Sequence, residues 1–222
     1  MNPAFSDITG YALDEVIGHR LSILSSGRHN ENFYKAMWEA LLKTGHWRGE
    51  IWNRRKSGDE YVERLSIDTS YNDDGSVRCR VGVFSDITQK KRTEEVVWRQ
   101  ANYDHLTGLP NRKLMEERLK TGQARAARVD TRLAFIFLDL DAFKEVNDSL
   151  GHDMGDKVLR QVAHRLVRSV RESDTVARFG GDEFVIVMGG VVSDDMVQRT
   201  CQAVLHNLGK PYRLQDTAVY LS

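Results

Sequence analysis

The chain has 222 residues and a mass of 25.4 kDa, which is enough for one large domain or two small ones. Lysine plus arginine and aspartate plus glutamate number 32 each, and this balanced charge argues against nucleic acid as the main partner, because such binders carry a basic excess. No apolar run reaches the roughly 20 residues that cross a bilayer, and no signal-peptide pattern opens the chain, so we expect a soluble, cytoplasmic protein without a membrane segment.

The first 90 residues read as helices followed by three strands. Residues 2–18 have short-helix character, and residues 31–43 predict an amphipathic helix, because Phe33, Met37 and Leu41 recur at helical spacing. The strand-like segments, separated by turn sequences, are residues 47–55, 61–71 and 78–88. Apolar and polar side chains alternate along the middle strand, which predicts an antiparallel sheet with one face in water.

This stretch resembles the PAS sensory family. The resemblance rests on residues 2–11 (Asn-Pro-Ala-Phe-Ser-Asp-Ile-Thr-Gly-Tyr), 45–55 (Gly-His-Trp-Arg-Gly-Glu-Ile-Trp-Asn-Arg-Arg) and 81–88 (Val-Gly-Val-Phe-Ser-Asp-Ile-Thr). It implies a PAS-like sensor domain over residues 1–88, built on an antiparallel sheet. The family begins with a strand hairpin before the Asn-Pro segment, so we expect the first strands to be missing.

The PAS resemblance leaves the ligand of this domain unknown. Members of the family bind haem, flavin, small metabolites or nothing. His19, His29 and His46 are candidate iron ligands, but a lone histidine is far more often a surface or packing residue, and no flavin-reactive cysteine motif is present. Cys79 and Cys201 lack metal-ligand spacing and are expected to be reduced thiols. We therefore assign no ligand.

Residues 89–103 are expected to form a helical linker. A charged run, Gln-Lys-Lys-Arg-Thr-Glu-Glu, leads into Val-Val-Trp-Arg-Gln-Ala. The simplest interpretation is a solvated helix, and a helix in this position would also transmit a rotation or pair with a second copy. Val97 and Ala101 share one stripe, which is too short to establish a coiled coil.

From residue 104 onward helices and strands alternate. Residues 133–139 (Leu-Ala-Phe-Ile-Phe-Leu-Asp) are apolar on both faces, which predicts a buried central strand. The other expected elements are helices at 113–127, 155–170 and 194–208 and strands at 175–177, 185–188 and 218–221. The order strand–helix–helix–strand–strand–helix–strand predicts an α+β sheet with helices packed against it.

Acidic residues stand at the ends of two of these strands. Asp139 ends the first strand, and the pair Asp182 and Glu183 follows two glycines in a turn typical of a hairpin. The glycines would let a phosphate ester approach the backbone closely. If the acids converge, their oxygens would bind Mg²⁺ or Mn²⁺ and activate a hydroxyl beside a phosphate. The alternative is a solvated hairpin tip.

Three motifs resemble those of a GGDEF-domain diguanylate cyclase. They are residues 138–148 (Leu-Asp-Leu-Asp-Ala-Phe-Lys-Glu-Val-Asn-Asp), 151–156 (Gly-His-Asp-Met-Gly-Asp) and 178–184 (Arg-Phe-Gly-Gly-Asp-Glu-Phe). The resemblance covers residues 104–222 and implies a nucleotide-cyclase-like, ferredoxin-type βααββαβ domain that is incomplete at its C-terminus. In that family two GTP-loaded domains of a homodimer face each other. Each 3′-hydroxyl attacks the other α-phosphate, giving cyclic di-GMP and two pyrophosphates, here under control of the PAS domain.

The resemblance also assigns roles by position. Asp182 and Glu183 would be catalytic, with Asp182 or a neighbour taking the hydroxyl proton, and the same two side chains would hold the metal with Asp139 and the Leu140 carbonyl. The substrate-binding residues would be Phe143, Lys144, Asn147, His152, Asp156, Gly180 and Gly181. Among them, Asn147 and Asp156 would read the guanine edge, although the helix dipole alone also explains an acid at position 156.

An inhibitory product site is implied by Arg171 and Asp174. The sequence Arg-Glu-Ser-Asp immediately precedes the strand that leads into the glycine turn, as in the Arg-x-x-Asp site of the family. There the arginine grips phosphate or guanine of cyclic di-GMP. The alternative is an ordinary surface ion pair at a helix end.

Two functions of different class remain open. The first is a diguanylate cyclase, which the intact acids Asp139, Asp182 and Glu183 favour. The second is a non-catalytic signalling module that binds GTP or cyclic di-GMP, which is favoured by the absence after Ser222 of the basic helix and final strand of the family. Asn147 and Asp156 disfavour an ATP cyclase. We interpret the chain as the middle of a longer sensor-cyclase.

Overall fold

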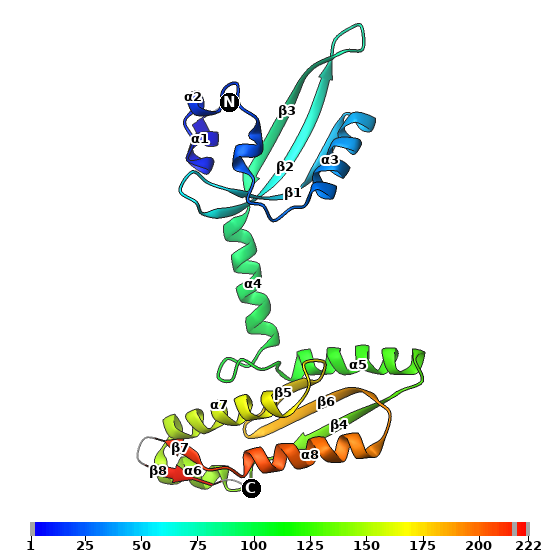
Figure 1. Cartoon of the computed structure of the whole chain (residues 1–222). Helices are drawn as coiled ribbons and strands as arrows, with labels where there is room; N and C mark the ends of the chain where they lie inside the picture. Colours follow the sequence, from blue (N-terminus) through cyan, green and yellow to red (C-terminus); the bar gives the residue numbers. More distant parts are fainter. Residues whose placement is uncertain (1–2, 215–216, 221–222) are drawn as a thin grey trace. The chain divides into compact units, whose positions relative to one another are not determined.

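The computed structural model describes residues 3–214 and 217–220. The chain divides at Val96–Val97 into two compact units, each with its own antiparallel sheet of three strands (Figure 1). The predicted α+β class is therefore confirmed. No helix in the described ranges is long and apolar enough to cross a membrane.

The first unit places helices before its sheet, as predicted. The helices are α1 (Pro3–Thr9), α2 (Leu13–Val16), the 3₁₀ helix η1 (Leu21–Leu24) and α3 (Glu31–Thr44), and the strands are β1 (His46–Arg54), β2 (Glu60–Tyr71) and β3 (Val77–Asp86), paired in the order β1-β2-β3. The Asn30 side chain accepts a hydrogen bond from the Phe33 amide at 3.0 Å and so caps the start of α3. Gly45, with φ of +76°, ends α3 in the left-handed conformation that favours glycine.

The core of the first unit lies between its helices and one face of the sheet. Phe5, Val16 and Leu24 pack together with Phe84 of β3, whose ring lies edge-on to Phe5 at 5.9 Å. On β2 the predicted alternation holds only in part, because Tyr61, Val62 and Glu63 are all buried. The exception with chemical consequences is Glu63, a carboxylate inside this core.

Helix α4 (Thr88–Asn102) follows β3 directly. Asp86 starts it, since its Oδ1 accepts a hydrogen bond from the Thr88 amide at 2.8 Å. Every side chain from 89 to 101 is exposed. The helix predicted for this stretch is thus present, with a solvated surface.

The second unit contains the remaining elements. They are α5 (Arg112–Arg128), β4 (Arg132–Leu138), α6 (Phe143–Leu150), α7 (His152–Ser169), β5 (Thr175–Gly180), β6 (Glu183–Val191), α8 (Asp194–Leu208), β7 (Tyr212–Leu214) and β8 (Thr217–Val219). From β4 to α8 they follow the predicted order. The short strand β7, which pairs with β8, was not predicted, and Leu221 at the end of the predicted last strand lies outside the described residues.

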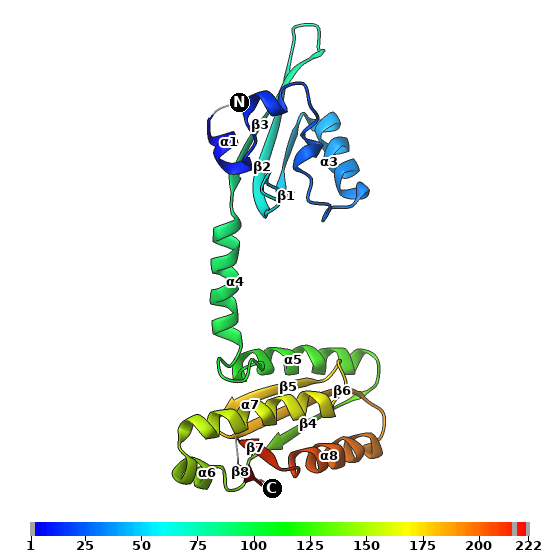
Figure 2. The ribbon, with the colours of Figure 1, turned by 60° about the vertical axis from the view of Figure 1, so that its left-hand side comes forward.

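Helices cover both faces of the β4-β6-β5 sheet (Figure 2). On one face α5 packs Met115 and Leu119 against Ala177, Val185 and Val187. On the other face lie α7 and α8 (Figure 1). The larger core there includes Val158, Val162 and Leu166 of α7, Val204 and Leu208 of α8, and Phe184, Ile186 and Met188 of β6.

The prediction that residues 133–139 form the buried central strand was wrong for the described part of the sheet. There β4 pairs only with β6, and its Phe135 and Phe137 are 46% and 49% exposed. The central strand is β6, in which residues 184–188 are all buried. A strand that is apolar on both faces can be the middle strand or an outer strand of a sheet, because the sequence does not show which strands pair with it.

Candidate active site

The glycine turn forms the tip of the β5–β6 hairpin. Gly180 pairs with Glu183, which leaves Gly181 and Asp182 as the two loop residues. Gly181 has φ of +50°, and a positive φ at the first loop position is common to the two turn types that two-residue hairpins prefer. No atom lies within 4 Å of the position that a Gly181 Cβ would occupy, so this part of the backbone is open to another molecule.

The sheet register brings the predicted acids to one end of β4 and β6. Leu138 pairs with Phe184, and continuing this antiparallel register by one residue sets Asp139 opposite Glu183. Asp139 is exposed, whereas Asp182 and Glu183 are half-buried. None of the three forms an ion pair with another described residue. The predicted gathering of carboxylates from neighbouring strands is therefore compatible with the fold.

These acids provide oxygen donors of the type that Mg²⁺ and Mn²⁺ prefer, and no cation of the described residues neutralises them. In the described part of the chain, however, no group of three or more Asp, Glu, His or Cys side chains lies close enough together to hold a metal ion. The oxygen donors are therefore of the right type for a divalent cation, but the strand register brings only two carboxylates, Asp139 and Glu183, opposite each other. A third ligand from the protein would have to be a main-chain oxygen or a side chain that moves.

The loop between β4 and α6 carries the next predicted residues. The Phe143 amide, predicted to bind phosphate, donates a hydrogen bond to the carbonyl of Leu140, predicted to bind metal, at 3.3 Å. Ala142 between them has φ of +62°, an unfavourable conformation for a residue with a Cβ. No side chain caps α6, so the Lys144 amide lies in a first turn whose amides have no partner within the helix.

The predicted guanine-reading residues lie on two helices, α6 and α7, that pack together. Asn147 lies on α6, and Asp156, half-buried, lies on α7 next to Gly155. A Cβ added at Gly155 would stand 2.0 Å from Oδ1 of Asn147, so the Asn147 side chain touches α7 at this glycine. His152 begins α7 and is exposed.

Arg171 and Asp174 form a tight turn between α7 and β5. The Arg171 amide donates to Asp174 Oδ2 at 3.1 Å, and the Asp174 amide donates to the Arg171 carbonyl at 3.0 Å. Asp174 Oδ1 is buried without a hydrogen-bond partner in the described residues, whereas the Arg171 side chain is exposed. No ion pair joins the two side chains in that part of the chain, so a simple surface ion pair does not account for them.

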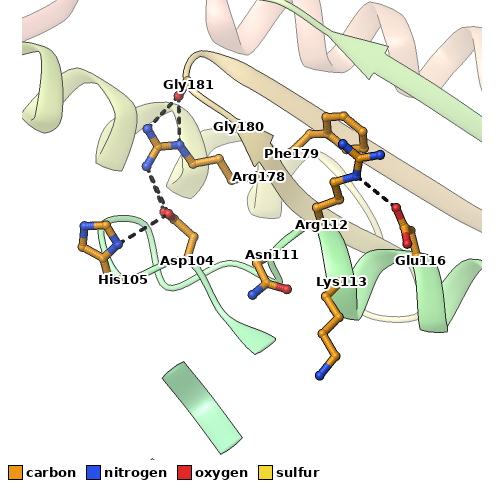
Figure 3. Close-up of a pocket in the computed structure, with 10 residues that line it drawn as sticks. All are labelled: Asp104, His105, Asn111, Arg112, Lys113, Glu116, Arg178, Phe179, Gly180 and Gly181. Carbon is orange, nitrogen blue, oxygen red and sulfur yellow. Dashed lines mark hydrogen bonds and ion pairs between the residues drawn. The ribbon is translucent and has the colours of Figure 1, made fainter. Parts of the chain in front are cut away.

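Behind the hairpin tip is an open cavity of about 580 Å³, with Arg178 on its wall (Figure 3). The Arg178 guanidinium donates through Nε and Nη2 to the Gly181 carbonyl at 2.9 and 2.6 Å, and through Nη1 to the Asp104 carboxylate at 3.0 and 3.2 Å. The cavity is lined by Asp104, His105, Asn111, Arg112, Lys113, Glu116, Arg178, Phe179, Gly180 and Gly181. Of the predicted site residues, only the two glycines reach it.

Asp104 and Arg178 are site residues to which the sequence assigned no role. Burial raises the pKa of Asp104, but hydrogen bonds from the Thr107 hydroxyl and amide and from Arg178 outweigh it and hold this pKa below its ordinary value. Asp104 is thus an ionised carboxylate that orients Arg178, and Arg178 in turn binds the Gly181 carbonyl of the hairpin turn. The sequence signal for the turn at Asp104 was its Asp-x-x-Thr spacing, in which the aspartate bonds to the amide three residues on.

The comparisons with known proteins agree with this geometry. The family model described as "Diguanylate cyclase, GGDEF domain" matches residues 101–222, and a PAS domain model matches residues 1–89. The bifunctional diguanylate cyclase/cyclic di-GMP phosphodiesterase MucR of Pseudomonas aeruginosa is 37% identical over 149 residues, which are 67% of this chain and 21% of MucR. The diguanylate cyclase TpbB of Pseudomonas aeruginosa is 43% identical over 117 residues, which are 53% of this chain and 27% of TpbB.

A solved structure extends the likeness to three dimensions. The coiled coil and GGDEF domain of DgcB from Caulobacter crescentus, in complex with cyclic di-GMP, superposes with a TM-score of 0.56 at 28% identity, covering 61% of this chain and 73% of that one. The sheet with its acidic hairpin thus defines a GGDEF domain. The chain belongs to the GGDEF-domain diguanylate cyclase family and carries a PAS domain before that domain. It spans 21% to 27% of the length of the two curated relatives.

Proposed function

We propose that this chain is the sensor and catalytic part of a diguanylate cyclase, which condenses two GTP into cyclic di-GMP and two pyrophosphates under control of its PAS domain. The enzyme acts as a homodimer, because each of two GGDEF domains brings one nucleotide to the reaction. We place it in the cytoplasm. The similarity to TpbB and MucR, both of which are named as diguanylate cyclases, supports this proposed activity. The boundaries that we propose are 1–88 for the sensor, 89–103 for the linker and 104–222 for the GGDEF domain.

The observation that carries the proposal is the register of β4 and β6. It supports a cluster in which Asp139 faces Glu183 beside the open turn of Gly181 and Asp182. Unpaired carboxylates at one sheet end repel one another, and a divalent cation bound among them removes that cost. A bare glycine turn beside them gives a phosphate room to approach.

In the proposed reaction, Mg²⁺ or Mn²⁺ would be held by Asp139, the Leu140 carbonyl, Asp182 and Glu183. When bound, the cation polarises the α-phosphate and lowers the pKa of the attacking hydroxyl. Asp182 or a neighbouring carboxylate takes the 3′-hydroxyl proton, the oxygen bonds to the α-phosphorus of the opposite GTP, and pyrophosphate leaves. The 3′-hydroxyl of that second nucleotide then loses its proton and attacks the α-phosphorus of the first, which releases the second pyrophosphate and closes the ring.

Further residues of this chain bind and orient the nucleotide. Asn147 and Asp156 read the guanine edge, with His152 close by at the start of α7. The amides of Phe143 and Lys144 contact the phosphates, and for Phe143 this requires giving up its bond to the Leu140 carbonyl. Gly180 and Gly181 admit the triphosphate to the hairpin backbone.

Arg171 and Asp174 form the proposed product site. The buried Oδ1 of Asp174, which has no hydrogen-bond partner among the described residues, supports this assignment, because a buried carboxylate oxygen needs a donor that those residues do not supply. The solved DgcB structure holds cyclic di-GMP. Arg171→Ala should relieve inhibition by added cyclic di-GMP, while Arg168→Ala, an exposed arginine on the last turn of α7, should leave the inhibition curve unchanged.

The activity is tested by incubating the purified chain with GTP and Mg²⁺ and measuring cyclic di-GMP and pyrophosphate. We expect product from the parent, none from Asp182→Asn, and parental rates from Glu117→Gln, which removes an exposed carboxylate on α5. Chelation of the metal should abolish turnover. Equal rates for the parent and Asp182→Asn would refute the proposed chemistry.

One observation favours a second function, that of a non-catalytic module that binds GTP or cyclic di-GMP. It is the lack, among the described residues, of three converging metal-ligating side chains. A chain without turnover that still binds cyclic di-GMP, and loses that binding in Arg171→Ala, would establish this second function instead.

A further inference from the structure

Gly155 lies in the first turn of α7. Helices α6 and α7 pack against each other (Figures 1 and 2). The residue is buried. A Cβ added here would stand 2.0 Å from Oδ1 of Asn147, 3.0 Å from its Cγ and 3.2 Å from Cζ of Phe143. The carboxamide of Asn147 therefore occupies the space that any other residue at position 155 would fill.

The backbone does not explain a glycine at this position. Gly155 is inside α7 and is not among the glycines with positive φ, so alanine has access to the same conformation. Glycine within a helix is about 1 kcal/mol less favourable than alanine. The structural requirement at position 155 is therefore the space taken by Asn147.

We infer that Gly155 is a specificity-positioning residue, which seats the Asn147 carboxamide against α7 so that it reads guanine together with Asp156. This inference rests on the proposed function, which assigns those two side chains to the base. Packing of the carboxamide against the helix backbone at Gly155 restricts the rotamers of Asn147, and a recognition group that is already ordered loses less entropy on binding. Asp156 follows Gly155 as the next residue of α7.

This role predicts an unusual separation between stability and recognition. The clashing atom is the end of a flexible side chain, so in Gly155→Ala the carboxamide swings away while the helices keep their packing. The new methyl group also favours the helix. The variant should therefore unfold at the parental temperature or above it, yet bind GTP more weakly.

The test uses the whole chain with Mg²⁺ and nucleotide analogues that carry a methylene group between the α- and β-phosphorus, which prevents loss of pyrophosphate. Affinities for the guanosine and adenosine analogues are measured by calorimetry, with thermal unfolding of each variant as the control for folding. In Gly155→Ala we expect about tenfold weaker binding of the guanosine analogue, as for one misplaced hydrogen-bonding group, and unchanged binding of the adenosine analogue.

A double variant separates positioning from general damage. In Asn147→Ala the space beside α7 is empty, so adding Gly155→Ala should cost no further affinity. An equal loss from Gly155→Ala with and without Asn147 would overturn the inference, as would equal losses for both nucleotide analogues. If the parent binds the two analogues equally well, the proposed guanine site itself fails, and that result is visible before any variant is made.

Discussion

Arg178 donates hydrogen bonds from one guanidinium to the carboxylate of Asp104, 74 residues earlier in the chain, and to the carbonyl of Gly181 in the hairpin turn. The two side chains are only 13% and 16% exposed. Asp104 is itself fixed by the Thr107 hydroxyl and amide at 2.6 and 2.8 Å. The turn that carries Asp182 is thus tied to the segment that opens the GGDEF domain.

Removing this arginine should weaken both the fold and the catalysis. Arg178→Ala leaves a mostly buried carboxylate without its cation, which costs about 3 kcal/mol when such a pair is broken. The Gly181 carbonyl loses its donors at the same time, so the turn should move and cyclic di-GMP production should fall. Urea denaturation measures the first effect and a GTP turnover assay the second.

The matched control is Arg199→Ala. Arg199 pairs with Asp195 on α8, but these side chains are 73% and 67% exposed, so the expected change in the free energy of unfolding is below about 0.5 kcal/mol. In the double variant Asp104→Asn with Arg178→Ala, the losses should be smaller than the sum of the single losses. Additive losses would show that the two residues act independently.

Local patterns sufficed for much of this domain but not for its long-range contacts. The hairpin acids, α7 and α8 follow from glycine turns and helical periodicity, which depend on near neighbours in sequence. The Asp104–Arg178 pair did not follow, because 74 residues separate its members. For the same reason the sequence did not show that β4 pairs only with β6 in the described part of the sheet. The site at Asn147 was assigned by resemblance, and the contact with Gly155 only became visible with both helices in place.

Glu63 in the first unit is a buried acid that forms no ion pair with another described residue. It is 4% exposed, its Oε2 accepts from the Tyr61 hydroxyl at 3.1 Å, and it is paired across the strands with Asp86. Burial raises the pKa of Glu63, with a smaller contribution from Asp86, while hydrogen bonds from Tyr61 and Asn53 oppose the rise. Arg55 does not offset this, because it pairs with Asp86 and lies over the Tyr61 ring.

Stability of the first unit should therefore fall as the pH rises. A raised pKa in the folded state means that the protonated Glu63 is favoured there, so its contribution is complete below the ordinary pKa of 4.5 and is lost as the pH passes the raised value. Glu63→Gln keeps the neutral shape and should remove this loss. Hydrogen exchange of the β2 amides, corrected for intrinsic rates, should show stronger protection in the variant than in the parent at pH 8.

Glu39→Gln is the control for Glu63→Gln. It removes an exposed carboxylate on α3 that pairs with Lys35 at 4.0 Å, and it should leave the pH profile of β2 unchanged. Identical profiles for the parent and Glu63→Gln would mean that Glu63 is already ionised in the folded protein or that water reaches it.

Ala142, between the acid at the end of β4 and the first turn of α6, should be replaceable by glycine with a gain in stability. Its φ of +62° costs about 1 kcal/mol for a residue with a Cβ, and the greater freedom of glycine in the unfolded chain offsets part of that gain. We expect a net stabilisation of roughly 0.5 kcal/mol in urea denaturation. Asp130→Gly, at φ of +50°, is the comparison and should gain less, because aspartate tolerates this conformation better than alanine.

Arg165 closes the end of α8 against the following strand. From α7 it donates to the carbonyls of Asn207 at 3.1 Å, Leu208 at 3.3 Å and Pro211 at 2.7 Å. Its guanidinium carbon lies 3.8 Å from the centre of the Tyr212 ring, which is fully buried. One planar cation thus satisfies helix-end carbonyls and covers an aromatic ring of β7.

Replacing Arg165 by lysine should be nearly as damaging as replacing it by alanine. A lysine keeps the charge but lacks the planar fork that reaches several carbonyls while stacking on Tyr212. We expect both variants to lose about 2 kcal/mol of unfolding free energy, measured in urea, from the unsatisfied carbonyls and the lost ring contact. Arg160→Ala, an exposed arginine on the same helix, should change it by less than about 0.5 kcal/mol. A lysine variant as stable as the parent would show that charge alone holds the end of α8.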